Sequence, residues 1–94
     1  MIRLDVFLKN VGLFRQRREA RRACDEGRIL VDGRPAKAAR PVKVGEVIRI
    51  EESHRWLEAE VLDLPERPPS RAERERYCRV LGLQQRQDDG DLAF

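Results

Sequence analysis

The chain opens with an apolar stripe of helical spacing. Its members recur at steps of three and four residues: Leu4, Phe7, Leu8 and Val11. This spacing predicts a helix over residues 3–11 with one apolar face, since such positions share a side at 3.6 residues per turn. Gly12 follows the last apolar position and is typical of the residue just after a helix.

A second stripe consists of small residues. Ala20, Ala23 and Cys24 are spaced three and four apart, which predicts a helix over residues 16–26 that another element can approach closely. Gly27 is the expected stop. The first 26 residues are therefore predicted to form two consecutive helices.

Strand character follows over residues 28–64. Ile29 to Val31 is β-prone, Asp32-Gly33 is a tight-turn signal, and Pro35 restricts the return strand to an edge or a brief pairing. Further along we expect a loop at 37–41, a turn at 42–46, a strand at 47–50, a polar connector at 51–55 and an alternating partner strand at 56–64.

Three prolines within residues 65–69 predict a boundary, because proline is excluded from helix and strand interiors. Ser70 and Glu73 then have the spacing of a capping box, which predicts a last helix over about 71–82 with Gly82 as its stop. We divide the chain into residues 1–64 with the sheet, 65–83 with the boundary and helix, and a loose acidic tail at 84–94.

Charge is distributed unevenly along the 94 residues. The net charge is +3, yet residues 1–50 carry 13 basic and six acidic side chains. Residues 51–94 carry seven basic and 11 acidic side chains. So basic a first half suggests a polyanionic partner. Seventeen of the 20 basic residues are arginine, whose forked guanidinium suits phosphates and base edges.

Several classes of protein are disfavoured. No apolar run approaches the roughly 18 residues of a membrane span, and the N-terminus lacks the apolar core of a signal peptide, so we expect a cytoplasmic protein without a membrane partner. Cys24 and Cys78 are expected to remain thiols. Together with His54 they fall short of the four ligands of a zinc site, so neither a metal nor a cofactor is expected.

The most concentrated positive charge lies in residues 15–22, with five arginines and one glutamate at the start of the second predicted helix. A helix N-terminus with free amides and arginines would bind phosphate. The simpler interpretation is a solvated helix face partly paired with Glu19, Asp25 and Glu26. The shortage of acidic residues within this segment favours the phosphate interpretation.

A run of motifs joins these elements: Arg3-Leu-Asp-x-Phe-Leu8, Arg17-x-x-Ala20, Gly27-x-Ile29-x-Val31-Asp-Gly33 and Val42-Lys-x-Gly-Glu46-x-Ile48. Their order and spacing resemble the S4 RNA-binding domain over residues 2–50. The resemblance implies an α+β, S4-like (αL) fold, with two N-terminal helices packed on a small, mostly antiparallel sheet. The C-terminal helix predicted above is added to it. Gln16 departs from the family, whose members often have Ser or Thr as helix N-cap at this position, and glutamine caps less well.

The resemblance also implies RNA binding through one basic surface formed by the helices and the hairpin. Carried over by position, the contact residues are Arg3, Lys9, Arg15, Arg17, Arg18, Arg21, Arg34, Lys37 and Lys43, with Asp5 among them. An acid in a basic surface is usually an arginine partner, so Asp5 is expected to fix Arg17 or Arg3. Asp5 is also favoured near a helix N-terminus by the dipole, and both roles are compatible.

The chain has no room for the catalytic domains that accompany this module in larger enzymes. It therefore resembles the stand-alone bacterial members, and its acidic tail makes it closer to the RqcP-type proteins than to the heat-shock S4 proteins. That resemblance implies structured rRNA and tRNA and the large ribosomal subunit as partners, in rescue or quality control of stalled translation. A general rRNA or tRNA binder or a ribosome-assembly adaptor remains the alternative. No DNA is expected, and a monomer is the default.

Alternative roles for several single residues stay open. An enzyme would use Cys24 or Cys78 with His54, but neither cysteine lies in a recognisable activating motif. His54 is expected in an exposed turn and the cysteines in the core. Trp56 could stack on a base, yet its alternating strand favours covering the core. Tyr77 contacts either RNA or the sheet. Residues 70–82 could additionally dock on a protein partner.

Overall fold

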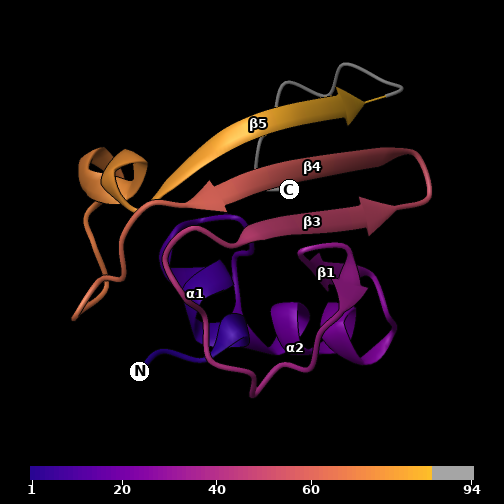
Figure 1. Ribbon diagram of the computed structural model, residues 1–94, viewed down its shortest axis with the longest axis horizontal. Helices are drawn as coiled ribbons and strands as arrows, with labels where there is room; N and C mark the ends of the chain where they lie inside the picture. Colours follow the sequence, from indigo (N-terminus) through magenta and orange to yellow (C-terminus); the bar gives the residue numbers. More distant parts are fainter. Residues whose placement is uncertain (86–94) are drawn as a thin grey trace.

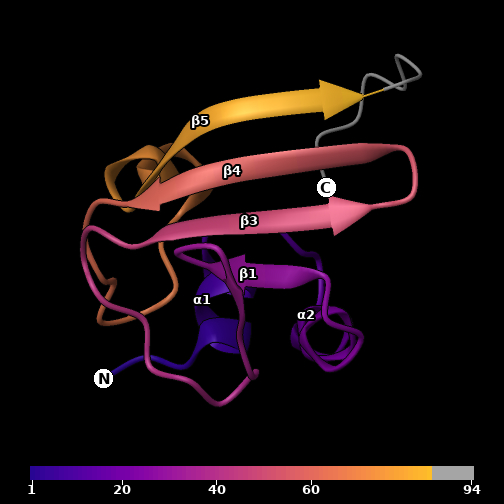
Figure 2. The same ribbon diagram turned by 45° about the vertical axis from the view of Figure 1, so that its right-hand side comes forward.

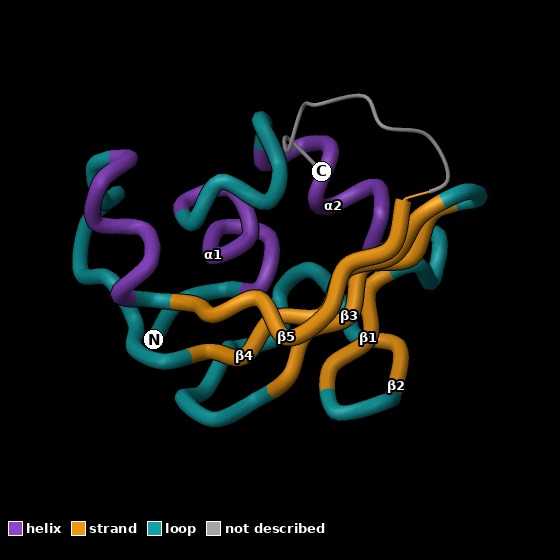
Figure 3. The backbone as a smooth tube through the Cα atoms, turned by 90° about the horizontal axis from the view of Figure 1, so that it is seen from above, coloured by secondary structure: helices purple, strands orange, loops and turns teal. Residues whose placement is uncertain are grey.

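Two short helices lie on one side of a five-stranded antiparallel sheet in the computed structural model, which describes residues 1–85 (Figures 1 and 3). The strand order is β2-β1-β3-β4-β5. The elements are, in chain order, α1 (Leu4–Asn10), α2 (Arg17–Asp25), β1 (Ile29–Val31), β2 (Arg34–Pro35), β3 (Val47–Glu52), β4 (Arg55–Val61), the 3-10 helix η1 (Arg71–Arg76) and β5 (Cys78–Gln85). The predicted α+β arrangement of two N-terminal helices on a mostly antiparallel sheet is confirmed.

The first helix forms where its apolar stripe predicted it. Leu4, Phe7 and Leu8 are completely buried between α2 and the sheet. Gly12 ends the helix with a φ of +82°, a left-handed conformation that side chains disfavour. The guanidinium of Arg74 in η1 also lies where a Cβ on Gly12 would stand, so this glycine admits a close approach as well as a turn.

The small residues of α2 allow close packing, as predicted. Ala20, Ala23 and Cys24 are buried and bring the backbone of α2 close to α1. Gln16 occupies the N-cap position without a side-chain capping bond, as its weak capping ability predicted.

The sheet forms the opposite wall of the core. Ile48 and Ile50 of β3 pair in register with Ala59 and Leu57 of β4, and all four side chains are buried on the helix side. The β1–β2 hairpin turns at Asp32, which has a φ of 51° and whose Oδ1 accepts a hydrogen bond from the Val47 amide at 3.0 Å. This bond ties the hairpin tip to the start of β3.

The C-terminal segment differs from the prediction. The capping box forms, with the Ser70 amide donating to Glu73 Oε1 at 3.0 Å, but the helix it begins ends at Arg76. The prediction of helix up to residue 82 is wrong, because residues from Cys78 onward form β5 along the edge of β4 (Figure 2). The strand satisfies backbone groups of β4 that would otherwise remain an open edge.

The predicted loose tail at 84–94 is corrected at its start, since residues 84–85 belong to β5. The rest of that prediction, over residues 86–94, lies outside the described residues.

Trp56 also differs from its prediction. It alternates with buried Leu57, so it lies on the sheet face away from the helices rather than over the core. Its indole Nε1 donates to Gln84 Oε1 at 2.7 Å, and the Arg49 guanidinium lies 4.4 Å from its ring centroid. Gly82, predicted as a helix stop, lies directly under this ring.

The positions of His54 and the two cysteines largely agree with the predictions. His54 is exposed in the turn between β3 and β4. Cys24 is buried in the core, and Cys78 packs against the core from β5 rather than from a helix. Tyr77 also packs against the core, in partly buried form.

Candidate nucleic-acid interface

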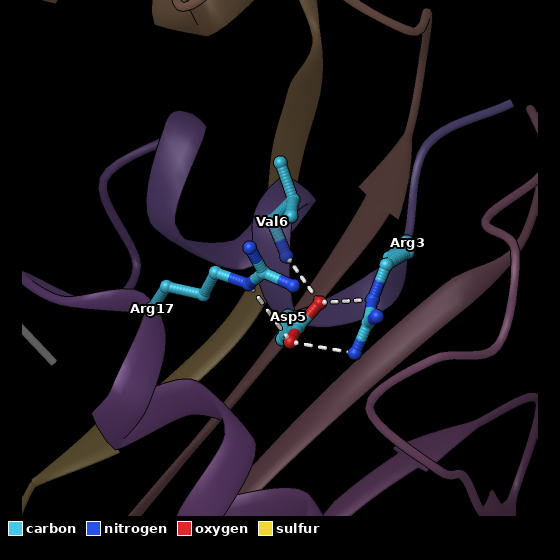
Figure 4. Close-up of polar contacts among 4 residues, drawn as sticks. All are labelled: Arg3, Asp5, Val6 and Arg17. Carbon is cyan, nitrogen blue, oxygen red and sulfur yellow. Dashed lines mark hydrogen bonds and ion pairs between the residues drawn. The ribbon is translucent and has the colours of Figure 1, made fainter.

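The strongest polar cluster of the N-terminal half is centred on Asp5, whose side chain is fully buried in the first turn of α1 (Figure 4). Arg3 donates two hydrogen bonds to this carboxylate, from Nε to Oδ1 at 3.1 Å and from Nη2 to Oδ2 at 3.2 Å. Arg17, twelve residues later at the start of α2, donates from Nε to Oδ2 at 3.2 Å. The Val6 amide donates to Oδ1 at 2.8 Å. We call Arg3, Asp5 and Arg17 the Asp5 cluster.

This arrangement fixes two arginines while leaving them accessible. The side chains of Arg3 and Arg17 are 44% and 55% exposed, although the carboxylate between them is not exposed at all. A buried charge without partners is costly, so the two guanidiniums are held firmly. Arginines held in place in this way are ready to bind an anion, because little side-chain freedom is left to lose. The predicted role of Asp5 as a partner of Arg17 or Arg3 is confirmed for both.

Other basic residues extend from this cluster along α2. Arg21 follows Arg17 by four positions and therefore lies on the same side of the helix. Arg18 is exposed and donates from Nη2 to Gln16 Oε1 at 3.1 Å. The first two turns of α2 thus present the guanidiniums of Arg18 and Arg21 next to the Asp5 cluster.

The loop after β2 lies against the start of α1. The Leu4 and Asp5 amides donate to the carbonyls of Arg40 and Ala38 at 2.9 and 3.2 Å. Arg3 forms an isolated β-bridge with Pro41. Exposed Lys37 is consequently carried on a loop that is attached to the Asp5 cluster through the backbone.

A second ion pair stabilises the turn that carries Lys43. Glu46 is buried and accepts hydrogen bonds from Arg40 Nη1 and Nη2 at 3.0 and 2.7 Å and from the Lys43 amide at 2.8 Å. The Arg40 guanidinium holds the pKa of Glu46 below its ordinary value. Arg40 and Glu46 are positioning residues, and the sequence did not reveal Arg40. The Val-Lys-x-Gly-Glu motif marked Glu46, but nothing in it identified Arg40 as its partner.

The predicted contact residues are not all brought together. All nine basic ones are exposed, and Arg3 and Arg17 are joined through Asp5. Lys9 lies in the last turn of α1, and Arg34 lies in the β1–β2 hairpin. Arg15 lines a separate hollow with Arg22 and Arg55. RNA contact by each of these residues stays a prediction.

The two cysteines are poorly suited to chemistry. Burial raises the pKa of the Cys24 thiol to about 11, and burial also raises the pKa of Cys78. Both are therefore protonated at neutral pH, and the thiolate is the reactive form.

Over residues 1–85 no helix has the length and apolarity to cross a membrane. The same residues contain no group of three or more His, Cys, Asp or Glu side chains placed to hold a metal.

Comparison with known proteins covers this same region. The S4 domain family matches residues 2–48. A protein named RQC P-site tRNA stabilizing factor from Halalkalibacterium halodurans is 37% identical over 65 residues, which are 69% of this chain and 74% of that protein. Its namesake from Bacillus subtilis is 35% identical over 63 residues, 67% and 73% of the two chains.

A solved structure agrees with the fold. The trimeric structure of Vibrio cholerae Heat Shock Protein 15 superimposes with a TM-score of 0.77, covering 84% of this chain and 80% of that one. The sequence identity is 22%, so this likeness concerns the fold alone. Because the superposition covers more of the chain than the S4 domain match, the similarity of fold extends beyond residue 48.

Proposed function

Because the chain belongs to the S4 domain family, we propose that it binds structured rRNA and tRNA on the large ribosomal subunit and acts in the quality control of stalled translation. The observation that carries this proposal is the similarity, over about two thirds of the chain, to proteins named RQC P-site tRNA stabilizing factor. The matched segment contains the Asp5 cluster and the basic residues around it.

The physical chemistry of that segment suits RNA. Guanidiniums bind phosphate through paired, charge-assisted hydrogen bonds, and the Asp5 cluster holds two of them in fixed positions. Structured RNA is read mainly through its shape and its phosphates. A small rigid surface with exposed arginines and lysines on several elements fits such a target better than it fits a small molecule.

The finer parts of the proposal are a non-catalytic role, a cytoplasmic location and a monomeric chain that binds neither DNA nor a membrane. The raised pKa values of Cys24 and Cys78 support the non-catalytic role, because a protonated thiol is a weak nucleophile. Sedimentation of the purified protein tests the monomer directly. A trimer, as in the structural neighbour, would refute that part alone.

The experiment that tests the central part is binding of the purified protein to separated ribosomal subunits and to free tRNA. The test variant is Arg17→Glu, and the matched control is Arg71→Glu, at an exposed position of η1. We expect the wild-type and Arg71→Glu proteins to prefer the large subunit, and Arg17→Glu to bind it at least tenfold more weakly. Equal binding to both subunits would favour a general rRNA binder or an assembly adaptor instead.

A further inference from the structure

A hollow outside the Asp5 cluster collects arginines from four places in the chain. It lies between α2 and the β3–β4 turn, and its charged lining residues are Arg15, Arg22, Arg28, Arg55, Glu19 and Glu52. Arg15 precedes α2, Arg28 follows it, and Arg55 begins β4. Only the tertiary fold brings these side chains to one site.

The hollow and the Asp5 cluster lie on opposite flanks of α2. Each helical residue turns by about 100°, so Arg22 points about 140° away from Arg17 around the axis. The buried residues Ala20, Ala23 and Cys24 lie outside the arc between them, and Cys24 is only about 20° from Arg17, next to the core. Arg17 therefore faces α1 and Asp5, while Arg22 faces Arg28 and the β3–β4 turn.

Four guanidiniums line the hollow, together with the two carboxylates of Glu19 and Glu52. Glu52 is shared between Arg28 at 3.6 Å and Arg55 at 3.8 Å, both long for an ion pair. Arg28 also pairs with Glu26 at 2.8 Å. The Arg28 and Arg55 side chains are 30% and 25% exposed and pair with Glu26 and Glu52, while Arg15 and Arg22 are exposed. An anion that accepts hydrogen bonds from several of these guanidiniums at once is favoured here.

We infer that this hollow binds a phosphate of the RNA backbone, as a second contact on the other flank of α2 from the Asp5 cluster. The inference rests on the proposed function and adds a site to it. A helix is about 10 Å across, so a polyanion that passes α2 reaches both flanks, whereas a free phosphate gains from only one. The hollow lies beside α2 and is lined by charged side chains, so it suits a segment of a longer RNA chain.

The test is the salt dependence of binding to the large ribosomal subunit. The test variant is Arg22→Gln/Arg55→Gln, which keeps hydrogen-bonding side chains at both positions. The control is Arg71→Gln/Arg76→Gln, which removes the same charge from exposed positions of η1. Each phosphate contact contributes about 0.7–0.9 to the slope of log K against log salt. We expect the test variant to lose at least one such increment relative to the control, and to bind several-fold more weakly at moderate salt.

The outcomes separate this inference from the proposed function. If the test and control variants have the same slope and affinity while Arg17→Glu loses binding, the hollow is not an RNA contact and the proposed function stands. If Arg17→Glu binds like wild type, the proposed function fails. Should the double variant unfold, Arg22→Gln alone repeats the test, because Arg22 is exposed on α2.

A free anion is the remaining possible occupant. Titration of the wild-type protein with inorganic phosphate, followed by NMR of the arginine Nε–H signals, identifies it. Saturation of the Arg22 and Arg55 signals at low phosphate, together with an unchanged RNA slope in the double variant, would assign the hollow to a free anion and overturn the inference. Weak phosphate binding together with the reduced slope supports it.

Discussion

Replacing Asp5 with asparagine is the most informative single change in this protein. Asparagine has the same shape and its Oδ1 still accepts the Val6 amide, so the helix start is preserved. What is lost is the negative charge that holds Arg3 and Arg17. The change also makes the protein more positive, which by itself strengthens binding to RNA. The two effects on affinity have opposite signs.

The stability lost in Asp5→Asn depends on how exposed Arg3 and Arg17 are. Removing one member of a fully buried pair costs about 3–5 kcal/mol. Here the arginines are 44% and 55% exposed and recover hydration, so we expect about 2 kcal/mol of lost stability. For a domain of this size that lowers Tm by about 8–16 °C. Binding RNA must then immobilise two freed arginines at about 0.5–1.5 kcal/mol each, which weakens affinity by about 5- to 150-fold.

The assay combines thermal unfolding with binding to the large ribosomal subunit at fixed salt. Asp25→Asn is the matched control, because it removes the same charge from an exposed position of α2. We expect Asp25→Asn to bind as tightly as wild type or slightly more tightly, and Asp5→Asn to bind more weakly. Equal or tighter binding by Asp5→Asn would refute the argument that the buried carboxylate prepares the arginines for RNA.

Three further changes test the fold around the site. Glu46→Gln should lower the free energy of unfolding at neutral pH by weakening the pair with Arg40. Because the pKa of Glu46 is lowered in the folded state, the stabilisation is full above the ordinary value of 4.5 and is lost as pH falls through the lowered pKa. Denaturant unfolding at several pH values should therefore show the wild type and the variant converging in acid. Gly82→Ala places a Cβ 2.9 Å from the Trp56 ring, and calorimetry should show a loss of about 1–3 kcal/mol. Gly12→Ala should cost about 1–2 kcal/mol in the same measurement, because its φ is +82°; an unchanged Tm in either glycine variant would contradict the described packing.

Local patterns were sufficient to predict the first half of the fold. In α1, the stripe that includes Leu4 and Phe7 buries one face, and in α2 the small residues Ala20 and Ala23 allow close packing. Asp32-Gly33 makes the turn it signals. Each of these features is set by residues within a few positions of one another, where spacing and turn chemistry determine the structure.

The second half depended on contacts that spacing does not reveal. The capping box at Ser70 begins a helix, but the residues after Arg76 gain more by pairing with β4, about twenty residues earlier in the chain. Gly82 looked like a helix stop because glycine often is one. Its actual role is to make room for the Trp56 ring, since a glycine in a strand admits an aromatic neighbour.

The candidate site was predictable to a similar extent. An acid in a basic surface predicted that Asp5 pairs with Arg17 or Arg3, and the structure shows both pairs. The sequence did not reveal Arg40 as the partner of Glu46. The approach of Arg55 to α2 was also invisible, because only the β3–β4 turn places it there. Long-range pairs that no motif records can be found only in the folded structure.

Binding to the large ribosomal subunit can be measured by sedimentation of a cell lysate through a sucrose gradient, with the wild-type and Arg17→Glu proteins compared in parallel. We expect the wild-type protein to travel with large subunits that carry peptidyl-tRNA, and Arg17→Glu to stay near the top of the gradient. Migration of the wild-type protein with the small subunit, with free tRNA, or identically to Arg17→Glu would contradict this expectation.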